Sequence, residues 1–362
     1  MRIELNKIVG NFNGKDCFVL VRCGTLGGEN LIMTAQKLDV DGMDFFSPIY
    51  ISESADNGKN WSQFHRENAF VDNFSKNGMR SVFGDVTHIF HKKTAVPLIV
   101  GRRFLYAEGK KSPQAITTHR VCYSTYNVQE KKFNNVAEVE VEGDYPFGIT
   151  SWGSQMIEEE NGDILIPVAI LYENGHYTSA VMRCAFDGET LKYVSMSNQL
   201  DVSESRGVFE ASLIKFSGKY YLTVRHDSAG YFSISDDGQN FSEPEPWHWD
   251  NGEILPTYNT QQHWLENNGN LYLIYTRRAE NNDHVFRNRA PLFVAEVDTE
   301  NMRILRSTER IVVPERGARL GNFGVTPLLN GDSLVTAAEW MQPIGCEKYG
   351  SDNSVFFARV TN

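Results

Sequence analysis

The strongest constraint on the fold is a hairpin that recurs along the chain: an alternating apolar run, a polar turn and a second apolar run. Four copies lie at 155–170, 212–225, 263–277 and 326–339. Their turn glycines, separated by 56, 51 and 62 residues, are Gly162, Gly218, Gly269 and Gly331. Two more copies, at 18–36 and 86–103, turn near Gly28 and Thr94. The chain therefore divides into six units of similar length.

A third run and another turn follow the hairpins, so each unit is predicted to be an antiparallel meander of four strands, A to D. Repeated meanders of this kind close radially into a β-propeller. We therefore predict an all-β fold in which residues 1–362 form one domain, a six-bladed β-propeller with few helices. The N-terminal run "RIELNKIV" has no hairpin of its own. We expect it to supply the outer strand that closes the ring with the last unit.

Composition excludes several kinds of partner. The net charge is −11 and no basic run exists, so we expect no nucleic acid. No apolar stretch reaches the ~18 residues of a membrane span, so we expect no membrane partner. The start "MRIELNKIVGNFNGK" lacks a signal-peptide core, which predicts a cytoplasmic protein, or a secreted or periplasmic one if this is a mature start. An anionic ligand stays possible, because a few converging arginines outweigh distant, screened carboxylates.

The cysteines and histidines indicate neither metal nor cofactor. Five widely spaced cysteines without a CxxC pair predict buried free thiols; they are Cys17, Cys23, Cys122, Cys184 and Cys346. No His or Cys pattern has the spacing of metal ligands. The glycine-rich "TLGGEN" does not indicate a phosphate-binding loop, because it falls on an A–B turn, away from the face where a site is expected.

A site is expected on the face of a propeller that carries the loops entering strand A and the B–C loops, because loops from all units converge there. Counting outward from the A–B turns places ionisable or amide groups at this level in several units. They are Arg22, Gln36, Asp85 or Thr87, Arg102, Glu210, Arg225, His263, Arg277 and Glu339. The side chains of the inner strands that lie next to the axis should otherwise be small or apolar. These polar residues therefore indicate a polar site near the axis.

The octet "SADNGKNW", residues 54–61, is predicted to be a C–D turn. Asp56 can accept backbone N–H groups, Gly58 allows the reversal, and Trp61 can pack between sheets. Its pattern S-x-D-x-G-x-x-W resembles the Asp-box of the sialidase (neuraminidase) superfamily. A partial copy is "ISDDGQNF", in which Ile234 replaces the first Ser and Phe241 the Trp. The resemblance implies that this loop stabilises the fold and lies on the face opposite the active site.

Residues 207–244 resemble the sialidase blade in which a Glu opens strand A, an Arg closes strand B and an Asp-box follows. The resemblance implies that Glu210 assists the nucleophile and that Arg225 belongs to the arginine cluster that binds the substrate carboxylate. Sialidases carry their acid/base Asp before the first Asp-box, where this chain offers Asp39, Asp41 and Asp44. We choose Asp41.

The chain departs from the sialidase pattern at three points. The Arg-Ile-Pro motif is absent, and Arg22 is only a positional substitute. No motif marks the tyrosine nucleophile, for which Tyr258 and Tyr349 are candidates. The third arginine of the cluster is open among Arg277, Arg287, Arg289 and Arg319.

Polar residues are unusually dense between residues 258 and 289. We expect His263, Arg277, Asp283, His284 and Arg287 on or near the axial face, with His226 and Asp227 similarly placed after Arg225. His and Arg together can bind a uronate, or act as base and charge neutraliser in a β-elimination.

The sequence thus predicts a glycoside hydrolase that releases an acidic or polar sugar from the end of a carbohydrate chain. Asp41, Glu210, His263 and Tyr258 are the candidate catalytic residues. The candidate substrate-binding residues are Arg22, Arg225, Asp227, Arg277, His284 and Arg287. The alternatives are a propeller polysaccharide lyase with His263 or His284 as base, and a glycan-binding propeller without catalysis. The sugar, the linkage and the oligomeric state are not predicted.

Overall fold

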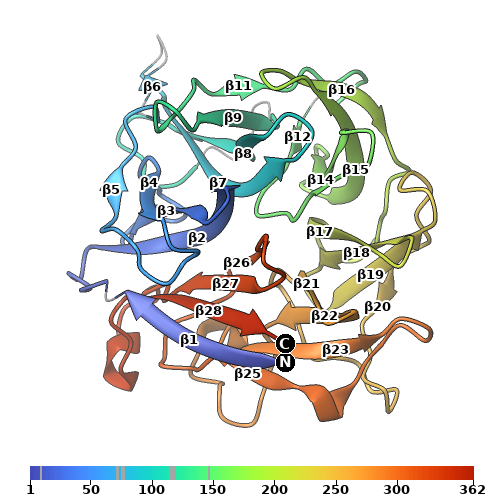
Figure 1. The fold of residues 1–362 in the computed structure, drawn as a ribbon. Helices are drawn as coiled ribbons and strands as arrows, with labels where there is room; N and C mark the ends of the chain where they lie inside the picture. The colour runs from blue at the N-terminus through green and yellow to red at the C-terminus, as the bar shows by residue number, and fades with distance from the viewer. Residues whose placement is uncertain (9, 71–72, 75–77, 114–119, 146) are drawn as a thin grey trace.

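A computed structural model describes residues 1–8, 10–70, 73–74, 78–113, 120–145 and 147–362. Six antiparallel sheets form a ring (Figure 1), which confirms the predicted six-bladed propeller. Helices in these ranges are limited to three short 3-10 turns, η1 Phe286–Asn288, η2 Arg306–Thr308 and η3 Cys346–Tyr349. Among the same residues no helix has the length and apolarity to cross a membrane.

Blades one to three follow one another from the N-terminus, and their inner strands lie nearest the axis. Blade one comprises β2 Asp16–Gly27, β3 Asn30–Asp39, β4 Tyr50–Ser54 and β5 His65–Arg66. Blade two comprises β6 Asn73–Phe74, β7 Arg80–His91, β8 Val96–Tyr106, β9 Cys122–Asn127, β10 Lys132–Phe133 and β11 Ala137–Glu138. Blade three comprises β12 Ile149–Thr150, β13 Ile157–Glu158, β14 Ile164–Leu171, β15 Tyr177–Phe186 and β16 Leu191–Met196. Its inner strand is divided into β12 and β13, which both pair with β14.

Blades four to six complete the ring. Blade four comprises β17 Phe209–Phe216, β18 Lys219–Arg225, β19 Gly230–Ser235 and β20 Glu245–Pro246. Blade five comprises β21 His263–Asn267, β22 Asn270–Tyr275, β23 Leu292–Asp298, β24 Arg303–Ile304 and β25 Arg310–Val313. Blade six comprises β26 Phe323–Pro327, β27 Ser333–Ala338, β28 Val355–Thr361 and, as its outer strand, β1 Arg2–Ile8. β1 pairs with β28 along its whole length, as expected for the closing strand.

The core consists of the apolar layers between neighbouring blades. All eight residues of β14 are buried, because blades on either side cover both faces of its sheet. This explains why "ILIPVAIL" is continuously apolar and does not alternate. The five cysteines are buried and free, as expected from their spacing.

Three inner strands carry a β-bulge at the same level. In β2, β7 and β17 two residues oppose one residue of the neighbouring strand, and the first of the two has a positive φ. These residues are Leu20 (φ +55), Asp85 (φ +52) and Glu210 (φ +50). A left-handed conformation is costly for side chains of this size, so it marks positions that the surrounding structure enforces. The bulges set the level at which Asp85 and Glu210 meet the axis.

The loop at 54–61 is held by its own side chains. The Ser54 hydroxyl donates to Asp56 Oδ1 at 2.8 Å, and Gly58 N donates to the Ser54 hydroxyl at 2.9 Å. Asn60 donates to Asp56 through its backbone and its side chain, at 2.9 and 2.6 Å. These bonds lower the pKa of Asp56 to about 2. Trp61 packs against Phe357 of blade six, so the loop joins the first blade to the last.

A second loop between β19 and β20 has the same hydrogen bonds in a different register. Ser235, and not Ile234, donates to an aspartate, which is Asp237, at 2.9 Å. Asp237 accepts the backbone and side-chain N–H groups of Asn240, both at 2.7 Å. The shift arises because this loop has one residue fewer between its aspartate and its glycine. The assignment of the two loops as Asp-boxes stays a prediction.

We expect Asp56→Ala to lower the free energy of unfolding by about 1–3 kcal/mol, because several N–H groups lose a charged acceptor. Asp236→Ala is the control, since Asp236 is exposed and lies beside the equivalent acceptor of the second loop. It should change stability by less than about 0.5 kcal/mol. Urea unfolding followed by tryptophan fluorescence measures both, and equal stabilities would contradict the role given to Asp56.

Candidate active site

Glu210 and Arg225 form the centre of the site. Glu210 lies at the bulge of β17, and Arg225 ends the neighbouring strand β18. Arg225 Nη1 donates to both carboxylate oxygens of Glu210 at 2.7 Å. The Arg225 guanidinium also lies over the Phe209 ring, 4.7 Å from its centre. The bulge thus turns the Glu210 carboxylate toward the end of the adjacent strand.

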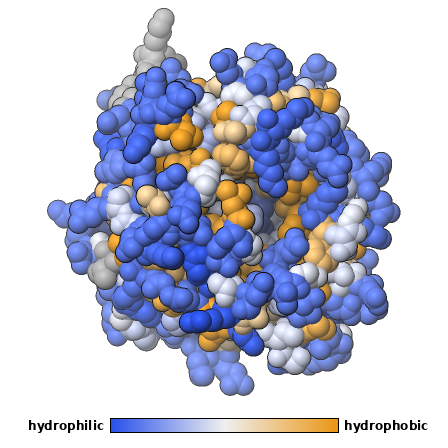
Figure 2. Space-filling model, in the orientation of Figure 1, coloured by the Kyte–Doolittle hydropathy of each residue, from blue (hydrophilic) through white to orange (hydrophobic). Residues whose placement is uncertain are grey.

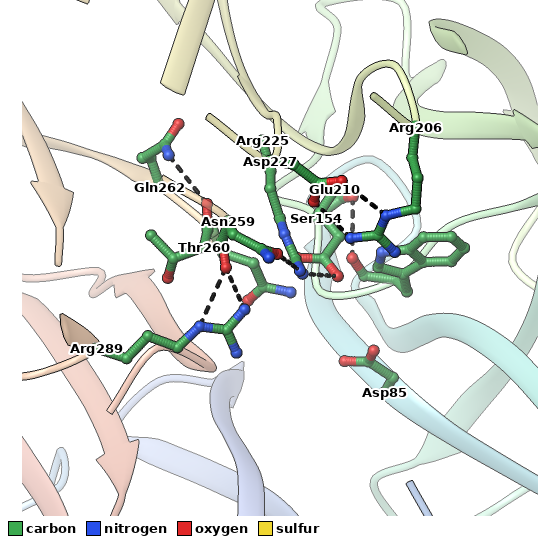
Figure 3. Close-up of polar contacts among 12 residues, drawn as sticks. Asp85, Ser154, Arg206, Glu210, Arg225, Asp227, Asn259, Thr260, Gln262 and Arg289 are labelled. Atoms are coloured by element: carbon green, nitrogen blue, oxygen red, sulfur yellow. Dashed lines mark hydrogen bonds and ion pairs between the residues drawn. The ribbon is translucent and has the colours of Figure 1, made fainter. Parts of the chain in front are cut away.

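A second arginine, Arg289, converges on the same place from blade five. It follows η1 in the loop between β22 and β23 and is almost fully buried. Arg289 Nε donates to the Asn259 backbone carbonyl at 3.1 Å, while Arg225 Nη2 donates to the Asn259 side-chain oxygen. Figure 3 shows the two guanidiniums directed toward Asn259 from different elements, with Asp85 apart from them on the side of blade two. Asn259 therefore positions both cations.

Positive charge exceeds negative charge around Glu210. Burial raises the pKa of Glu210, but the guanidiniums of Arg225, Arg289 and Arg102 outweigh it, so the net shift is downward. Burial and repulsion from Arg225 and Arg319 hold the pKa of Arg289 well below its usual range. The arrangement therefore stabilises an ionised Glu210 and leaves an excess of positive charge.

Several donors near this cluster lack an acceptor. In the described part of the chain, buried side-chain nitrogens without a hydrogen-bond partner include Nε of Arg102, Arg225 and Arg319, and Nε2 of Gln261. A buried donor without a partner is costly, so such atoms usually bind a ligand or water. Cationic donors of this kind suit a carboxylate, which offers up to four acceptor positions.

One layer nearer the A–B turns, Arg22 closes the axis. It is two residues beyond the bulge residue Leu20, and it is 1% exposed. Its Nη1 donates to Asp85 at 2.8 Å, its Nε to the Phe323 carbonyl at 3.3 Å, and its Nη2 to Gln261 at 3.3 Å. These partners belong to blade two, blade six and the loop entering blade five. The hydrogen bonds of the Arg22 guanidinium are thus accepted by groups of the protein.

His263, predicted at the site, also belongs to the buried layer. Its Nδ1 is 2.7 Å from the Ser212 hydroxyl, and its ring packs on Phe323. Burial and the neighbouring Arg22 lower the pKa of His263 to about 3.

The other predicted residues divide into two groups. Arg277 donates to both oxygens of Glu309 and lies over Phe293, so the structure does not bring it to the cluster. Both oxygens of Asp227 accept from Arg206 beside the cluster, at 2.6 and 2.9 Å. Tyr258, His284 and Arg287 line a separate groove at the rim. Asp41 is exposed, whereas Asp44 of the same loop is half-buried.

The sequence missed Asn259 and left Arg289 among four alternatives. The available signal was the polar run "YNTQQHW" before β21, which interrupts the apolar pattern of an inner strand. Which arginine turns inward depends on the loop between β22 and β23, whose path is set by side-chain hydrogen bonds. Among the residues that the structure describes, His, Cys, Asp and Glu form no group of three able to hold a metal ion.

Comparison with known proteins finds matches for the fold of this chain but none for its sequence. No family model matches the chain, and no curated protein matches it. A Dyadobacter fermentans protein of unknown function is 16% identical over 99% of both chains, with a TM-score of 0.70. The Trypanosoma rangeli sialidase in complex with sialic acid is 15% identical, with a TM-score of 0.66. The chain has the fold of the sialidases.

The match covers this chain more completely than the sialidases. It spans 98% of this chain and 57% of the Trypanosoma rangeli sialidase. The Hadza microbial sialidase Hz136 is 12% identical, with a TM-score of 0.66, over 95% of this chain and 66% of its own. At these identities the likeness establishes the propeller and not the chemistry.

We expect Arg22→Met to lower the free energy of unfolding by about 3–5 kcal/mol, because it leaves the buried Asp85 carboxylate without its cation. Adding Asp85→Leu should restore much of the loss, since Leu20 occupies the equivalent bulge in blade one. Urea unfolding measures the single and double variants. If the double variant is as unstable as Arg22→Met, the uncompensated carboxylate is not the cause.

Glu339, also predicted at the axial level, holds the segment after η3. Its carboxylate accepts the backbone N–H groups of Asp352 and Ser354 at 2.8 and 3.0 Å. Burial raises the pKa of Glu339 to about 7 despite these bonds and the nearby Arg316. Folding therefore favours the protonated carboxyl group.

A raised folded-state pKa predicts that this contribution to stability is complete below about pH 4.5 and is lost as the pH rises through about 7. Glu339→Gln should remove roughly 1–3 kcal/mol of this decline between pH 5 and 8. Urea unfolding across that range compares the variant with the wild type. Parallel profiles would assign the decline to other groups.

Proposed function

We propose that the protein hydrolyses the glycosidic bond of a terminal sugar that carries a carboxylate. The observation that supports this most is the excess of buried, incompletely bonded guanidinium donors around the ionised Glu210. A neutral sugar would leave the surplus positive charge uncompensated, whereas a carboxylate can bind Arg225 and Arg289 together. The bound sialic acid named for the Trypanosoma rangeli sialidase is a sugar of this class.

In this proposal Arg225 and Arg289 orient the sugar, and Asn259 fixes the two guanidiniums before substrate arrives. Pre-organised cations of this kind lower the barrier because they need not rearrange during the reaction. Glu210 is ionised and acts as the base. Arg22, one layer deeper, closes the axis, which favours a chain end over a continuous polymer.

The proton donor in this proposal belongs to the loop that carries Asp41 and Asp44. Asp44 is the better placed of the two, since it is half-buried near Arg287 and Arg319, whereas Asp41 is exposed. The donor protonates the leaving oxygen as its bond to the anomeric carbon breaks. The oxygen of a water molecule then bonds to that carbon, and Glu210 takes the proton of the water.

We expect Glu210→Gln to lower kcat at least 100-fold, because the amide cannot accept the proton. Fluorogenic glycosides of sialic, glucuronic and galacturonic acid provide the assay. Asp163→Asn is the control, since Asp163 also pairs with an arginine but lies beyond the A–B turn of blade three. Asp41→Asn and Asp44→Asn, measured beside it, should show a larger loss for Asp44.

Product mass distinguishes the alternatives. Hydrolysis of an acidic oligosaccharide adds water, whereas elimination does not and gives a product that absorbs in the ultraviolet. An unsaturated product would replace this proposal with a lyase, for which His284 is more accessible than the buried His263. Tight binding without any product would indicate a glycan-binding propeller.

A further inference from the structure

A groove of about 620 Å³ lies at the rim of the cluster. It is lined by residues of the loop entering β21, the loop between β22 and β23, and the loop after β27. They are Tyr258, Arg278, Asp283, His284, Val285, Phe286, Arg287, Asn288 and Pro343. The hydrolysis proposed above assigns no step to the residues of this groove.

Two asparagines shape the wall of the groove. Asn282 Nδ2 donates to the carbonyls of Arg277 and Ala290 at 2.8 and 2.7 Å, which ties the two ends of the segment together. Asn288 Nδ2 donates to the side-chain oxygen of Asn282 at 3.0 Å, and Asn288 Oδ1 accepts the Tyr258 hydroxyl at 2.8 Å. Both asparagines are almost fully buried. The groove is therefore built into the fold.

The groove begins where the cluster ends. Tyr258, which lines the groove, precedes Asn259, which positions Arg225 and Arg289. Arg287 of the groove lies close enough to Arg225 for their charges to repel, and this repulsion together with burial lowers the pKa of Arg287. A molecule bound at the cluster can therefore extend directly into the groove.

Two of the cationic side chains of the groove have a carboxylate beside them, whereas Arg287 has, in the described ranges, only the more distant carboxylates of Asp227 and Asp44. Arg278 lies 3.9 Å from Asp283, and His284 lies 2.8 Å from Glu315. For Arg287 the structure records no ion pair within its described residues, and the guanidinium is exposed above the Phe286 ring. Its backbone has φ +57, a left-handed conformation that projects the side chain from η1.

The groove also offers apolar ring surface. Phe286 is 42% exposed, and Tyr258 also lines the groove. The C–H face of a pyranose packs on such rings, while an acidic substituent pairs with a guanidinium. Ring surface beside an unpaired cation thus matches an acidic sugar better than a neutral one.

We propose that this groove is a second sugar subsite, which binds the residue next to the terminal sugar and selects one that carries a carboxylate. The substrate class is then an oligosaccharide with consecutive acidic sugars. This inference rests on the proposed function, because the cluster must hold the terminal sugar for the groove to receive the next one.

Calorimetry with two series of probes tests the inference without relying on turnover. The probes are galacturonate and its α-1,4-linked tetramer, and sialic acid and its α-2,8-linked tetramer, each titrated into the Glu210→Gln protein. We expect at least one tetramer to bind 10-fold or more tightly than its monomer. Adding Arg287→Gln should abolish that gain, so that the tetramer binds no more tightly than its monomer. Arg306→Gln is the matched control, because Arg306 is an exposed arginine of blade five that pairs with Glu253.

Two results would overturn the second subsite: tetramers that bind no tighter than their monomers, or a gain that survives Arg287→Gln. A carboxyl-reduced tetramer that binds as tightly as the acidic one would also remove the selection for acidic sugars. Failure of the proposed function has a different signature. In that case the tetramer gain depends on Arg287, yet wild-type protein releases no sugar from the same tetramers.

Discussion

The buried ion pair between Arg22 and Asp85 is the interaction on which the arrangement at the axis depends. A propeller leaves a space where its inner strands face one another, and side chains must fill it. Here one guanidinium spans that space and bonds groups from several blades. Gly153 of blade three is required beside it, because a Cβ there would lie 2.4 Å from Arg22 Nη2. Arg22 therefore joins the blades and forms the floor of the candidate site.

Above this floor, the polar groups are organised by backbone geometry more than by their own side-chain contacts. The bulges of β7 and β17 bring Asp85 and Glu210 to one level, and Asn259 joins two arginines from different blades. The surplus of positive charge is tolerable because the protein buries it beside a carboxylate and aromatic rings. The site is consequently suited to an anion, and its neighbouring groove continues the same preference through Arg287.

The sequence predicted the fold well because hairpins and turn glycines are local signals with a regular period. It also predicted that Glu210 and Arg225 lie side by side at the axial end of one hairpin, as the structure shows. It did not place Arg22 in a buried layer, because the bulge at Leu20 adds a residue and shifts every later side chain of β2. Arg289 could not be chosen over Arg277, since the path of the 16-residue connection between β22 and β23 depends on Asn282 and Asn288.

The outer strand of blade six has a consequence for synthesis of the chain. β1 is made before the other strands of the propeller, but its partner β28 lies at residues 355–361, so the ring cannot be completed until those residues have left the ribosome. Until then β1 is an unpaired strand and the face of blade one that packs on blade six is uncovered, a state prone to association with other chains. During synthesis of blades two to five, association is therefore a hazard at β1 and at blade one.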